Sequence, residues 1–305
     1  MGEPYGFDIE DQTDRIVVIT GANSGIGLET TKVLTAAGAT VVMACRSVAR
    51  AEAARTALVG AQRKRAIVSE LDLASPASVE AFATKFGSEY GRLDLLINNA
   101  GIMATPPALT KEGIERQWAT NHLGHFALTG LLLGYFQSRP GARVISVSSL
   151  AAAGGSSELT IRTDLDEYSR FGTYEDTKLA NLVFAVELNH RLAAENSTAI
   201  SVACHPGITH TNLAAGIAIP GFTKLALKAS QLMFQPVAIG ALPILRAATE
   251  RAVEGGQYYG PSGPRQRRGL PKQIPLVAGA ANRSTGRSLW EQSMKLSGVR
   301  YLSGD

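Results

Sequence analysis

A tyrosine and a lysine four positions apart, Tyr174 and Lys178, open an apolar-periodic run that continues to Leu192. If that run is a helix, both side chains lie on one face, one turn apart, and can act on the same molecule. A phenol normally titrates near pH ~10, but an ammonium fixed beside it favours the phenolate. The pair could therefore exchange a proton with a carbonyl or an alcohol near neutral pH. The spacing is weak evidence by itself, because any amphipathic helix can carry it by chance.

A glycine-rich turn near the N-terminus is the second chemical feature. It follows residues 15–20, whose β-branched run predicts a strand, and precedes residues 28–37, which predict a helix. Glycines let a backbone approach a pyrophosphate, and a helix start offers free N–H groups, so the unit is typical of dinucleotide binding. Three glycines in eight residues favour this interpretation over an ordinary turn. The residues expected to contact the cofactor here are Gly21, Asn23, Ser24, Gly25, Ile26 and Gly27.

Alternating strands and helices must position these residues. Further strands are predicted at 40–45, 66–71, 93–97, 143–147 and 199–203, and helices at 48–58, 78–86, around 114–136 and after Tyr174. Strands that are apolar throughout and separated by helices indicate a parallel sheet covered on both faces. We therefore expect a Rossmann-type α/β fold, a doubly wound and mostly parallel sheet flanked by helices on both faces. Ser75-Pro76 and Gly38 are expected helix start and stop signals.

Length and composition limit the class of protein. A chain of 305 residues with 45% hydrophobic content and no low-complexity linker is expected to form a single domain over residues 1–305. Residues 1–15 carry five acidic side chains and no apolar run, so no signal peptide is predicted. No uncharged stretch is long enough to span a membrane, so the simplest location is cytoplasmic. Cys45 and Cys204 lie in strand-like runs and are expected to be reduced core residues.

Charge and histidine spacing argue against two other classes. A net charge of +4 from 30 basic and 26 acidic residues is too balanced for a nucleic-acid-binding surface, although it suits an anionic cofactor. His205 and His210 have no partner ligands at metal-site spacing, so we predict no metal. The other histidines, His122, His125 and His190, are expected to pack in helices.

The end of the second strand indicates which dinucleotide is bound. In nicotinamide enzymes the adenosine ribose lies there, and an acidic residue holds a free 2′-hydroxyl whereas a basic one holds a 2′-phosphate. Cys45 carries no carboxylate and Arg46 follows it, so NADP(H) is favoured over NAD(H). A solvated surface charge is the alternative for Arg46. After the third strand, Asp72 could accept a hydrogen bond from the adenine amino group while Leu73 covers the ring.

In their order along the chain, these motifs resemble the classical short-chain dehydrogenase/reductase family over residues 15–212. The matching pieces are Thr20 to Gly27, Asn98-Asn99-Ala100-Gly101, Asn121, Ser149, Tyr174 with Lys178, and Pro206-Gly207. Met43 to Arg46, Asn121 to Phe126, Asp176 to Asn181 and the long gap from Ser149 to Tyr174 are similar to the retinol-dehydrogenase-like branch. Thr177 stands where serine is common, a departure that should matter little.

The resemblance implies a role for each catalytic residue. Tyr174 would give its proton to a carbonyl oxygen as hydride arrives from the nicotinamide, or take the hydroxyl proton in reverse. Lys178 would lower the pKa of Tyr174 and hold the nicotinamide ribose. Ser149, which the family pattern favours over Ser148, would stabilise charge on the reacting oxygen. Asn121 would bind a water that relays protons from Lys178, although an amide satisfied within its helix is the alternative.

The same resemblance implies further contacts along the chain. Asn99, Ala100 and Gly101 would border the cofactor, and Pro206, Gly207, Ile208 and Thr209 would hold the nicotinamide carboxamide. The apolar segment near 213–235 would be a lid, whose composition suggests a lipophilic substrate; a packed helix pair and an interfacial helix are the alternatives. Within a C-terminal extension near 255–305, residues 255–269 are expected to be a solvated basic loop. Leu289 and Trp290 are expected on an amphipathic helix that packs on the body.

The sequence predicts an oxidoreductase that uses NADP(H) to interconvert a carbonyl and an alcohol on a small, lipophilic substrate. A non-catalytic dinucleotide-sensing protein on the same fold is one alternative, but such a protein would not need a proton donor. An epimerase or dehydratase is a second alternative. Tyr168 lacks a lysine four positions on, so it is expected at the surface or beside the substrate. Family analogy suggests a homodimer or homotetramer through the helices near 114–136 and 179–192.

Overall fold

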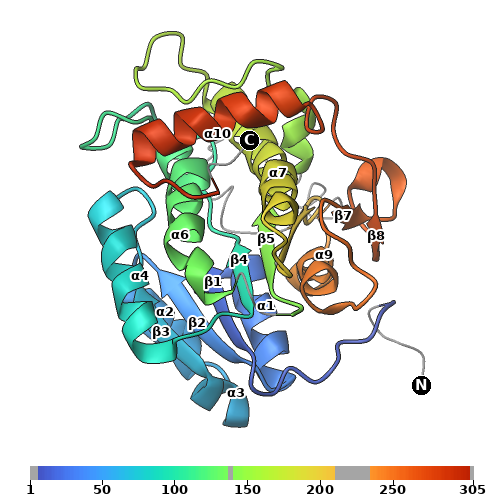
Figure 1. Cartoon of the computed structure of the whole chain (residues 1–305). Coiled ribbons are helices and arrows are strands. Elements are labelled where there is room, and N and C mark those ends of the chain that lie inside the picture. The colour runs from blue at the N-terminus through green and yellow to red at the C-terminus, as the bar shows by residue number, and fades with distance from the viewer. Residues whose placement is uncertain (1–5, 137–139, 210–233, 303–305) are drawn as a thin grey trace, which may run out of the picture.

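A computed structural model describes residues 6–136, 140–209 and 234–302 and centres on an eight-stranded sheet in the order β3-β2-β1-β4-β5-β6-β7-β8 (Figure 1). The strands are β1 (Ile16–Thr20), β2 (Thr40–Cys45), β3 (Ala66–Glu70), β4 (Leu95–Asn98), β5 (Arg143–Val147), β6 (Ile200–Cys204), β7 (Tyr258–Pro261) and β8 (Pro271–Gln273). Neighbouring strands from β3 to β7 are parallel, and β8 is antiparallel to β7. The predicted fold class is therefore confirmed.

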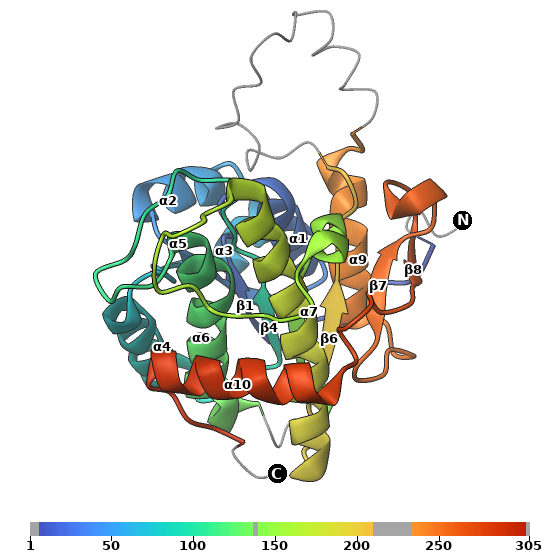
Figure 2. The ribbon, with the colours of Figure 1, turned by 90° about the horizontal axis from the view of Figure 1, so that it is seen from above.

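Helices cover both faces of this sheet (Figures 1 and 2). They are α1 (Gly25–Ala36), α2 (Val48–Thr56), α3 (Gly60–Arg65), α4 (Pro76–Tyr90), α5 (Arg116–Trp118), α6 (Gly124–Leu132), α7 (Arg170–Ala194), α9 (Val237–Thr249) and α10 (Arg283–Ser297). Shorter turns are η1 (Ala119–Leu123), η2 (Leu133–Tyr135), η3 (Leu150–Gly154) and η5 (Pro264–Gln266). Ser75 caps α4 by accepting from the Ser78 N–H, with Pro76 at the first helical position, as predicted.

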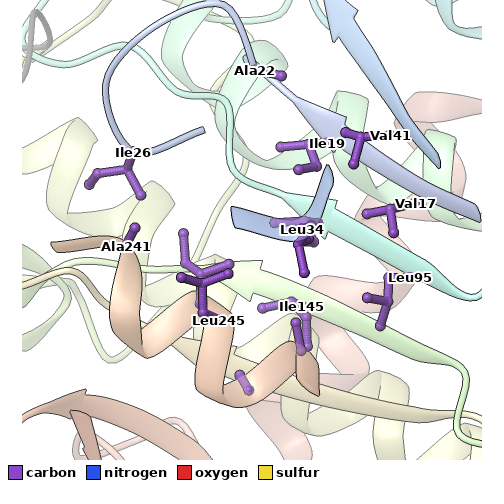
Figure 3. Close-up of a cluster of buried hydrophobic side chains, with 14 of the residues drawn as sticks. Val17, Ile19, Ala22, Ile26, Leu34, Val41, Leu95, Ile145, Ala241 and Leu245 are labelled. Carbon is purple, nitrogen blue, oxygen red and sulfur yellow. The ribbon is translucent and has the colours of Figure 1, made fainter. Parts of the chain in front are cut away.

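Successive side chains of each central strand point into two different cores. Val17 and Ile19 of β1 join Leu34 of α1 and Leu245 of α9 on one face (Figure 3), whereas Val18 joins α4, α6 and α7 on the other. This alternation follows from the two-residue period of a strand. Because both faces are buried, the strands read as continuous apolar runs, and the functional side chains are left to the strand ends.

Three parts of the sequence interpretation need correction. The long helix around 114–136 is present but not α-helical throughout, because η1, a π-helical turn that contains Asn121, lies between α5 and α6. Residues 255–269 are not a solvated loop throughout, since β7 is buried and extends the sheet beside β6. His190 is exposed and does not pack in a helix core. By contrast, α10 forms where predicted and buries Leu289 and Trp290.

Three further expectations concern other parts of the chain. Most of the expected lid near 213–235 lies outside the described residues, as does His210. Within the described ranges, no helix is long and apolar enough to cross a membrane. Cys45 and Cys204 are both buried and unpaired, as predicted.

Candidate active site

The carboxyl ends of the parallel strands border a cavity of about 690 Å³. In open α/β sheets, ligands bind at this edge, where the strand order reverses, and β1 is that point here because it pairs with both β2 and β4. Residues predicted from the sequence that line the cavity are Gly21, Asn23, Ser24, Gly25, Ile26, Gly27, Arg46, Asp72, Leu73, Asn99, Ala100, Gly101, Ser149, Tyr174, Lys178, Pro206, Gly207, Ile208 and Thr209. Asn121 does not line it.

The glycine turn between β1 and α1 leaves no space for side chains. Gly21 has a φ of +67°, and a Cβ there would lie 3.1 Å from Ala100. A Cβ on Gly27 would lie 2.6 Å from both the Gly21 carbonyl oxygen and the Asn99 amide nitrogen. Ser24, the N-cap of α1, makes no side-chain capping hydrogen bond. The turn therefore brings backbone N–H groups to the cavity and can hold a phosphate.

The far end of the cavity is basic. Arg46 and Arg50 line it beside Ser47, whose hydroxyl caps α2 by accepting from the Arg50 N–H. Burial raises the pKa of the Cys45 thiol to about 11, so this position stays neutral. Two guanidinium groups and no carboxylate at the end of β2 suit a phosphate better than a bare ribose.

Tyr174 and Ser149 meet on the opposite wall, from α7 and from the end of β5. Tyr174 is buried, and this burial raises the pKa of its phenol to about 12, while a hydrogen bond with Ser149 opposes the rise. Ser148 also lines the cavity, but its hydroxyl donates to the Lys178 carbonyl oxygen at 2.7 Å. Ser149, which the family pattern favours, is the serine that pairs with the phenol.

The ammonium of Lys178 is buried beside them but does not contact the phenol oxygen. It donates to the Val147 carbonyl oxygen at 3.1 Å and lies 5.8 Å from the centre of the Tyr174 ring. Burial lowers the pKa of Lys178 to about 8. Desolvation disfavours the charged form of both groups, which is why the pKa of the phenol rises and that of the ammonium falls. The expected lowering of the Tyr174 pKa by Lys178 stays a prediction.

Asn121 holds the cavity wall rather than lining the cavity. Its side-chain amide accepts from the Ile102 N–H at 2.8 Å, donates to the Ile102 carbonyl at 2.9 Å and donates to Thr177 at 3.0 Å. Gly101 approaches both Asn121 and Lys178, since a Cβ there would lie 3.4 and 3.3 Å from them. The π-helical turn thus aims Asn121 at the loop after β4, and π turns occur often at functional sites.

His125 belongs to the site although the sequence suggested only helix packing. One ring nitrogen contacts the Asn121 carbonyl oxygen and the other the Thr20 hydroxyl, both at 2.9 Å. The same hydroxyl accepts from the Asn99 and Ala100 N–H groups. Burial lowers the pKa of His125 to about 3, so the ring is neutral and bridges η1 to the end of β1. A histidine four residues after Asn121 on one helix face was the available signal.

Tyr168 lies outside the cavity lining of the described residues, and its hydroxyl has other partners. It donates to the Thr105 carbonyl at 2.9 Å and accepts from the Gln117 amide at 2.8 Å. A phenol with both partners in the protein is not free to act on a substrate. Tyr168 supports the loop that carries Thr105, which does line the cavity.

The segment after β6 is held from behind by the loop between β7 and β8. Ile208 donates its N–H to the Arg267 carbonyl at 2.8 Å, and Gly207, with a φ of +67°, lies against the same carbonyl. His205 is fully buried, and its ring contacts the Gln266 side chain at 3.1 Å. Within the described part of the chain, no group of three acidic, histidine or cysteine side chains is arranged to hold a metal.

Comparison with known proteins defines the class to which this fold and site belong. A profile described as short chain dehydrogenase matches residues 15–219, which include the glycine turn, Ser149, Tyr174 and Lys178. The match spans more than half of the chain. The protein belongs to the short chain dehydrogenase family.

Individual relatives indicate which branch of the family this chain resembles. Retinol dehydrogenase 14 of Homo sapiens is 39% identical over 302 residues, covering 93% of this chain and 87% of that protein. Retinol dehydrogenase 12 of Mus musculus is 34% identical over 290 residues, covering 94% and 87%. A solved structure of an uncharacterized protein from Mycobacterium paratuberculosis has 36% identity and a TM-score of 0.77, covering 96% of this chain and 97% of that one. The predicted retinol-dehydrogenase-like branch is confirmed.

Proposed function

We propose that this protein uses NADP(H) to interconvert a carbonyl and an alcohol on a lipophilic substrate. The observation that carries the proposal is the arrangement of Tyr174, Ser149 and Lys178 on one wall of the cavity whose other end is a glycine turn. A protein that only sensed a dinucleotide would not need a phenol and a hydroxyl paired at the cavity wall. The enzymatic reading is therefore favoured over the binding protein.

The residues divide the proton chemistry between them. When bound, the nicotinamide supplies or accepts the hydride at the carbonyl carbon. A pKa of about 12 keeps the Tyr174 phenol protonated near neutral pH, so it can donate its proton to the carbonyl oxygen during reduction. The Ser149 hydroxyl stabilises the charge that develops on the same oxygen. In alcohol oxidation the Tyr174 oxygen must first lose that proton, and as the phenolate it would accept the hydroxyl proton, while Lys178 is placed to hold the ribose.

The choice of NADP(H) rests on the basic end of the cavity. Arg46 and Arg50 both line it, and Cys45 at the end of β2 provides no carboxylate for a free 2′-hydroxyl. A guanidinium can bind two phosphate oxygens at once, whereas a free ribose hydroxyl offers it only one oxygen. The glycine turn suits the pyrophosphate that both dinucleotides share.

A lipophilic substrate is supported by the substrate side of the cavity. Met103, Leu150, Phe171 and Phe234 line it. Phe171 is 52% exposed although it is large and apolar, so it is available to a ligand at the cavity mouth. Two relatives bear the name retinol dehydrogenase, which agrees with an apolar alcohol or aldehyde.

The test follows NADPH oxidation across aldehydes and ketones of graded size and polarity, with retinal among them. We expect turnover to increase with the apolar area of the substrate and to vanish in the Tyr174→Phe variant. Tyr168→Phe is the matched control, since it removes a nearby hydroxyl that has a structural role, and it should keep turnover. Binding of NADPH without oxidation by any substrate in the panel would favour the sensing protein. The single domain and the cytoplasmic location stay predictions.

A further inference from the structure

A side-chain amide on α5, that of Gln117, lies between two segments that border the substrate side of the cavity. Gln117 is 0% exposed, so it cannot touch a ligand itself. The helix that carries it, α5, lies beside α7 (Figure 2). Met103 and Thr105 of the loop after β4 line the cavity, and so does Phe171 of α7. The amide is therefore placed to connect the two segments that carry these lining residues.

The first of the two segments, the loop after β4, is held by Gln117 at a left-handed residue. The Gln117 side-chain oxygen accepts from the Ala104 N–H at 2.9 Å. Ala104 has a φ of +51°, a conformation that a residue with a Cβ keeps only when its surroundings hold it there. The bond therefore fixes the direction of Met103 and Thr105, which flank Ala104 and line the cavity.

Asn121 holds the same loop from four positions further along the chain. Its amide binds both the N–H and the carbonyl of Ile102, at 2.8 and 2.9 Å. Residues four positions apart lie on one face of a helix, so the two amides reach neighbouring peptide groups of one loop. Their remaining bonds differ, because Asn121 donates to Thr177 inside α7 whereas Gln117 donates to the start of that helix.

The second segment, which leads into α7, is held by the nitrogen of the Gln117 amide. This nitrogen donates to the Arg170 carbonyl at 3.0 Å and to the Tyr168 hydroxyl at 2.8 Å. The Tyr168 hydroxyl donates in turn to the Thr105 carbonyl at 2.9 Å. One amide group therefore binds both segments, and the Tyr168 hydroxyl adds a second link between them.

Phe171 places the second segment next to the reacting groups. It follows Arg170 directly and lies three positions before Tyr174 on α7. Residues three positions apart are neighbours on one face of a helix, so the Phe171 ring borders the space beside the phenol. The distance between Phe171 and the loop that carries Met103 thus depends on Gln117.

Gln117 is itself fixed by the residues on either side of it. Glu115, also 0% exposed, is the N-cap of α5, and its carboxyl group accepts from the Trp118 N–H at 2.9 Å. The Glu115 N–H donates to the Arg162 carbonyl at 2.9 Å. Trp118 is fully buried and meets the His122 ring edge-on at a centroid distance of 5.9 Å. A side chain on such a support has a fixed position, as a residue that positions a binding site requires.

We propose that Gln117 is a positioning residue that sets the width of the substrate side of the cavity and thereby determines which carbonyl compounds the enzyme prefers. The inference rests on the proposed reaction, because the width matters only to a bound substrate. An amide suits this role, since its oxygen accepts from one segment while its nitrogen donates to the other. Loss of the amide leaves Tyr174 and Ser149 in place but removes the fixed separation between the two segments.

The test compares Gln117→Met, which keeps the length of the side chain without its amide bonds, with Gln12→Met. Gln12 is a matched control, because it is 2% exposed and its amide also has three partners, which are Glu10, Asp11 and Arg15. It lies before the start of β1, at the edge of the sheet opposite the cavity. Oxidation of NADPH is followed with a panel of aldehydes of graded width, and kcat and KM are measured for each.

The readout is the ratio of kcat/KM for the two aldehydes between which the wild type discriminates most. We expect Gln117→Met to reduce this ratio by about 10-fold, the effect of a small change in the shape of a pocket. The KM of the preferred aldehyde should rise while its kcat stays within about twofold, because the proton donor is not displaced. Gln12→Met should keep the ratio of the wild type.

Three kinetic results would overturn the proposal. One is a wild type that discriminates less than about 10-fold across the panel, since no width would then be set. Another is an unchanged ratio in folded Gln117→Met, and the third is an equal loss in Gln12→Met. If Gln117→Met does not fold, as judged by circular dichroism, Gln117→Glu replaces it. That variant keeps the acceptor for Ala104 but turns an oxygen toward the Arg170 carbonyl, and an unchanged ratio there would also overturn the proposal.

Failure of the proposed reaction gives a different result. A wild type that oxidises NADPH with no aldehyde of the panel would contradict that reaction, and hydrogen exchange would then test Gln117 alone. Residues 102–105 and 168–171 should both exchange faster in the substituted protein than in the wild type, because both lose a bond to the amide. Unchanged exchange in either segment would show that Gln117 does not hold the two together.

Discussion

The two halves of α7 face different surroundings and have different compositions. Near its start, Tyr174 and Lys178 are buried polar groups that line the cavity, and the buried Thr177 hydroxyl accepts from Asn121 of η1. Near its end, Phe184 and Glu187 face α10 through ring stacking and an ion pair. Burial disfavours the charged form of Lys178 and lowers its pKa to about 8, so the first half costs stability at neutral pH. The second half contributes stability, and substitutions should separate the two effects.

The largest effect is expected from Tyr174→Phe. Removing the hydroxyl removes the proton donor, so kcat should fall by about 10²–10⁴-fold, the usual contribution of general acid–base catalysis. The thermal midpoint should stay equal or rise, because the variant no longer buries a phenol hydroxyl that has Ser149 as its hydrogen-bond partner. Steady-state kinetics and calorimetry on the same sample check both. If kcat stayed within twofold of the wild type, the two halves of α7 would not differ as described.

Trp290→Ala should produce the opposite pattern. Loss of a fully packed indole from the α10 contact should lower the free energy of unfolding by about 3–5 kcal/mol. The value of kcat at a temperature where the variant is folded should stay close to that of the wild type. Urea denaturation measures the change when it is monitored by far-ultraviolet circular dichroism, a signal that does not rely on tryptophan fluorescence. Glu291→Ala is the control and should lie within about 0.5 kcal/mol of the wild type. A variant with normal stability would contradict the role given to α10.

Arg46→Asp tests the contribution of the basic end of the cavity to cofactor choice. The change removes a charge-assisted bond to the 2′-phosphate, worth about 1.5–3 kcal/mol, and adds repulsion. Affinity for NADPH should fall by roughly 10–100-fold, while affinity for NADH should change little. Titration of both dinucleotides by fluorescence measures the ratio, with Arg63→Asp as a control because Arg63 lies on α3 away from the cavity lining. Equal loss of both dinucleotides would end the NADP(H) assignment.

Two histidines at the junction of these regions predict an acid-sensitive fold. His122 contacts α10 and His125 contacts the cavity end of β1, and burial lowers their pKa values to about 4 and about 3. The unfolded chain binds protons below pH ~6.5 where the folded protein does not, so stability falls as the pH drops from 6.5 toward 4. Between pH 7 and 5, each histidine should lower the free energy of unfolding by about 1 kcal/mol per pH unit. Urea midpoints that do not change across this range would contradict the prediction, and His122→Gln should reduce the slope.

The sequence predicted the strand ends well because short motifs carry them. The glycine turn, Ser149 and the Tyr174–Lys178 spacing depend on local backbone geometry that a few residues specify. The strand at Arg143–Val147 was predicted to the residue, because Val144, Ile145 and Val147 form a short β-branched run of the kind that a sheet covered on both faces buries.

Other features depend on contacts between distant segments and could not be predicted. The π-helical turn at Asn121 is maintained by bonds to Ile102 and Thr177, which lie 19 and 56 positions away. The pKa of Tyr174 follows from burial, which a four-residue spacing does not report. α10 was predicted as a helix, but its seat on α6 and α7 was not, because amphipathicity shows that a face is covered and not what covers it.

The most direct test of the central claim is a crystal structure of the protein with NADP⁺ bound, in which two regions of the cavity are measured together. We predict that Tyr174 Oη and Ser149 Oγ both face the carbon of the nicotinamide ring that exchanges hydride. We also predict that Lys178 Nζ lies about 3 Å from a ribose hydroxyl and that Arg46 contacts the 2′-phosphate. A nicotinamide ring turned away from the Tyr174 hydroxyl, or a 2′-phosphate remote from Arg46, would contradict the account.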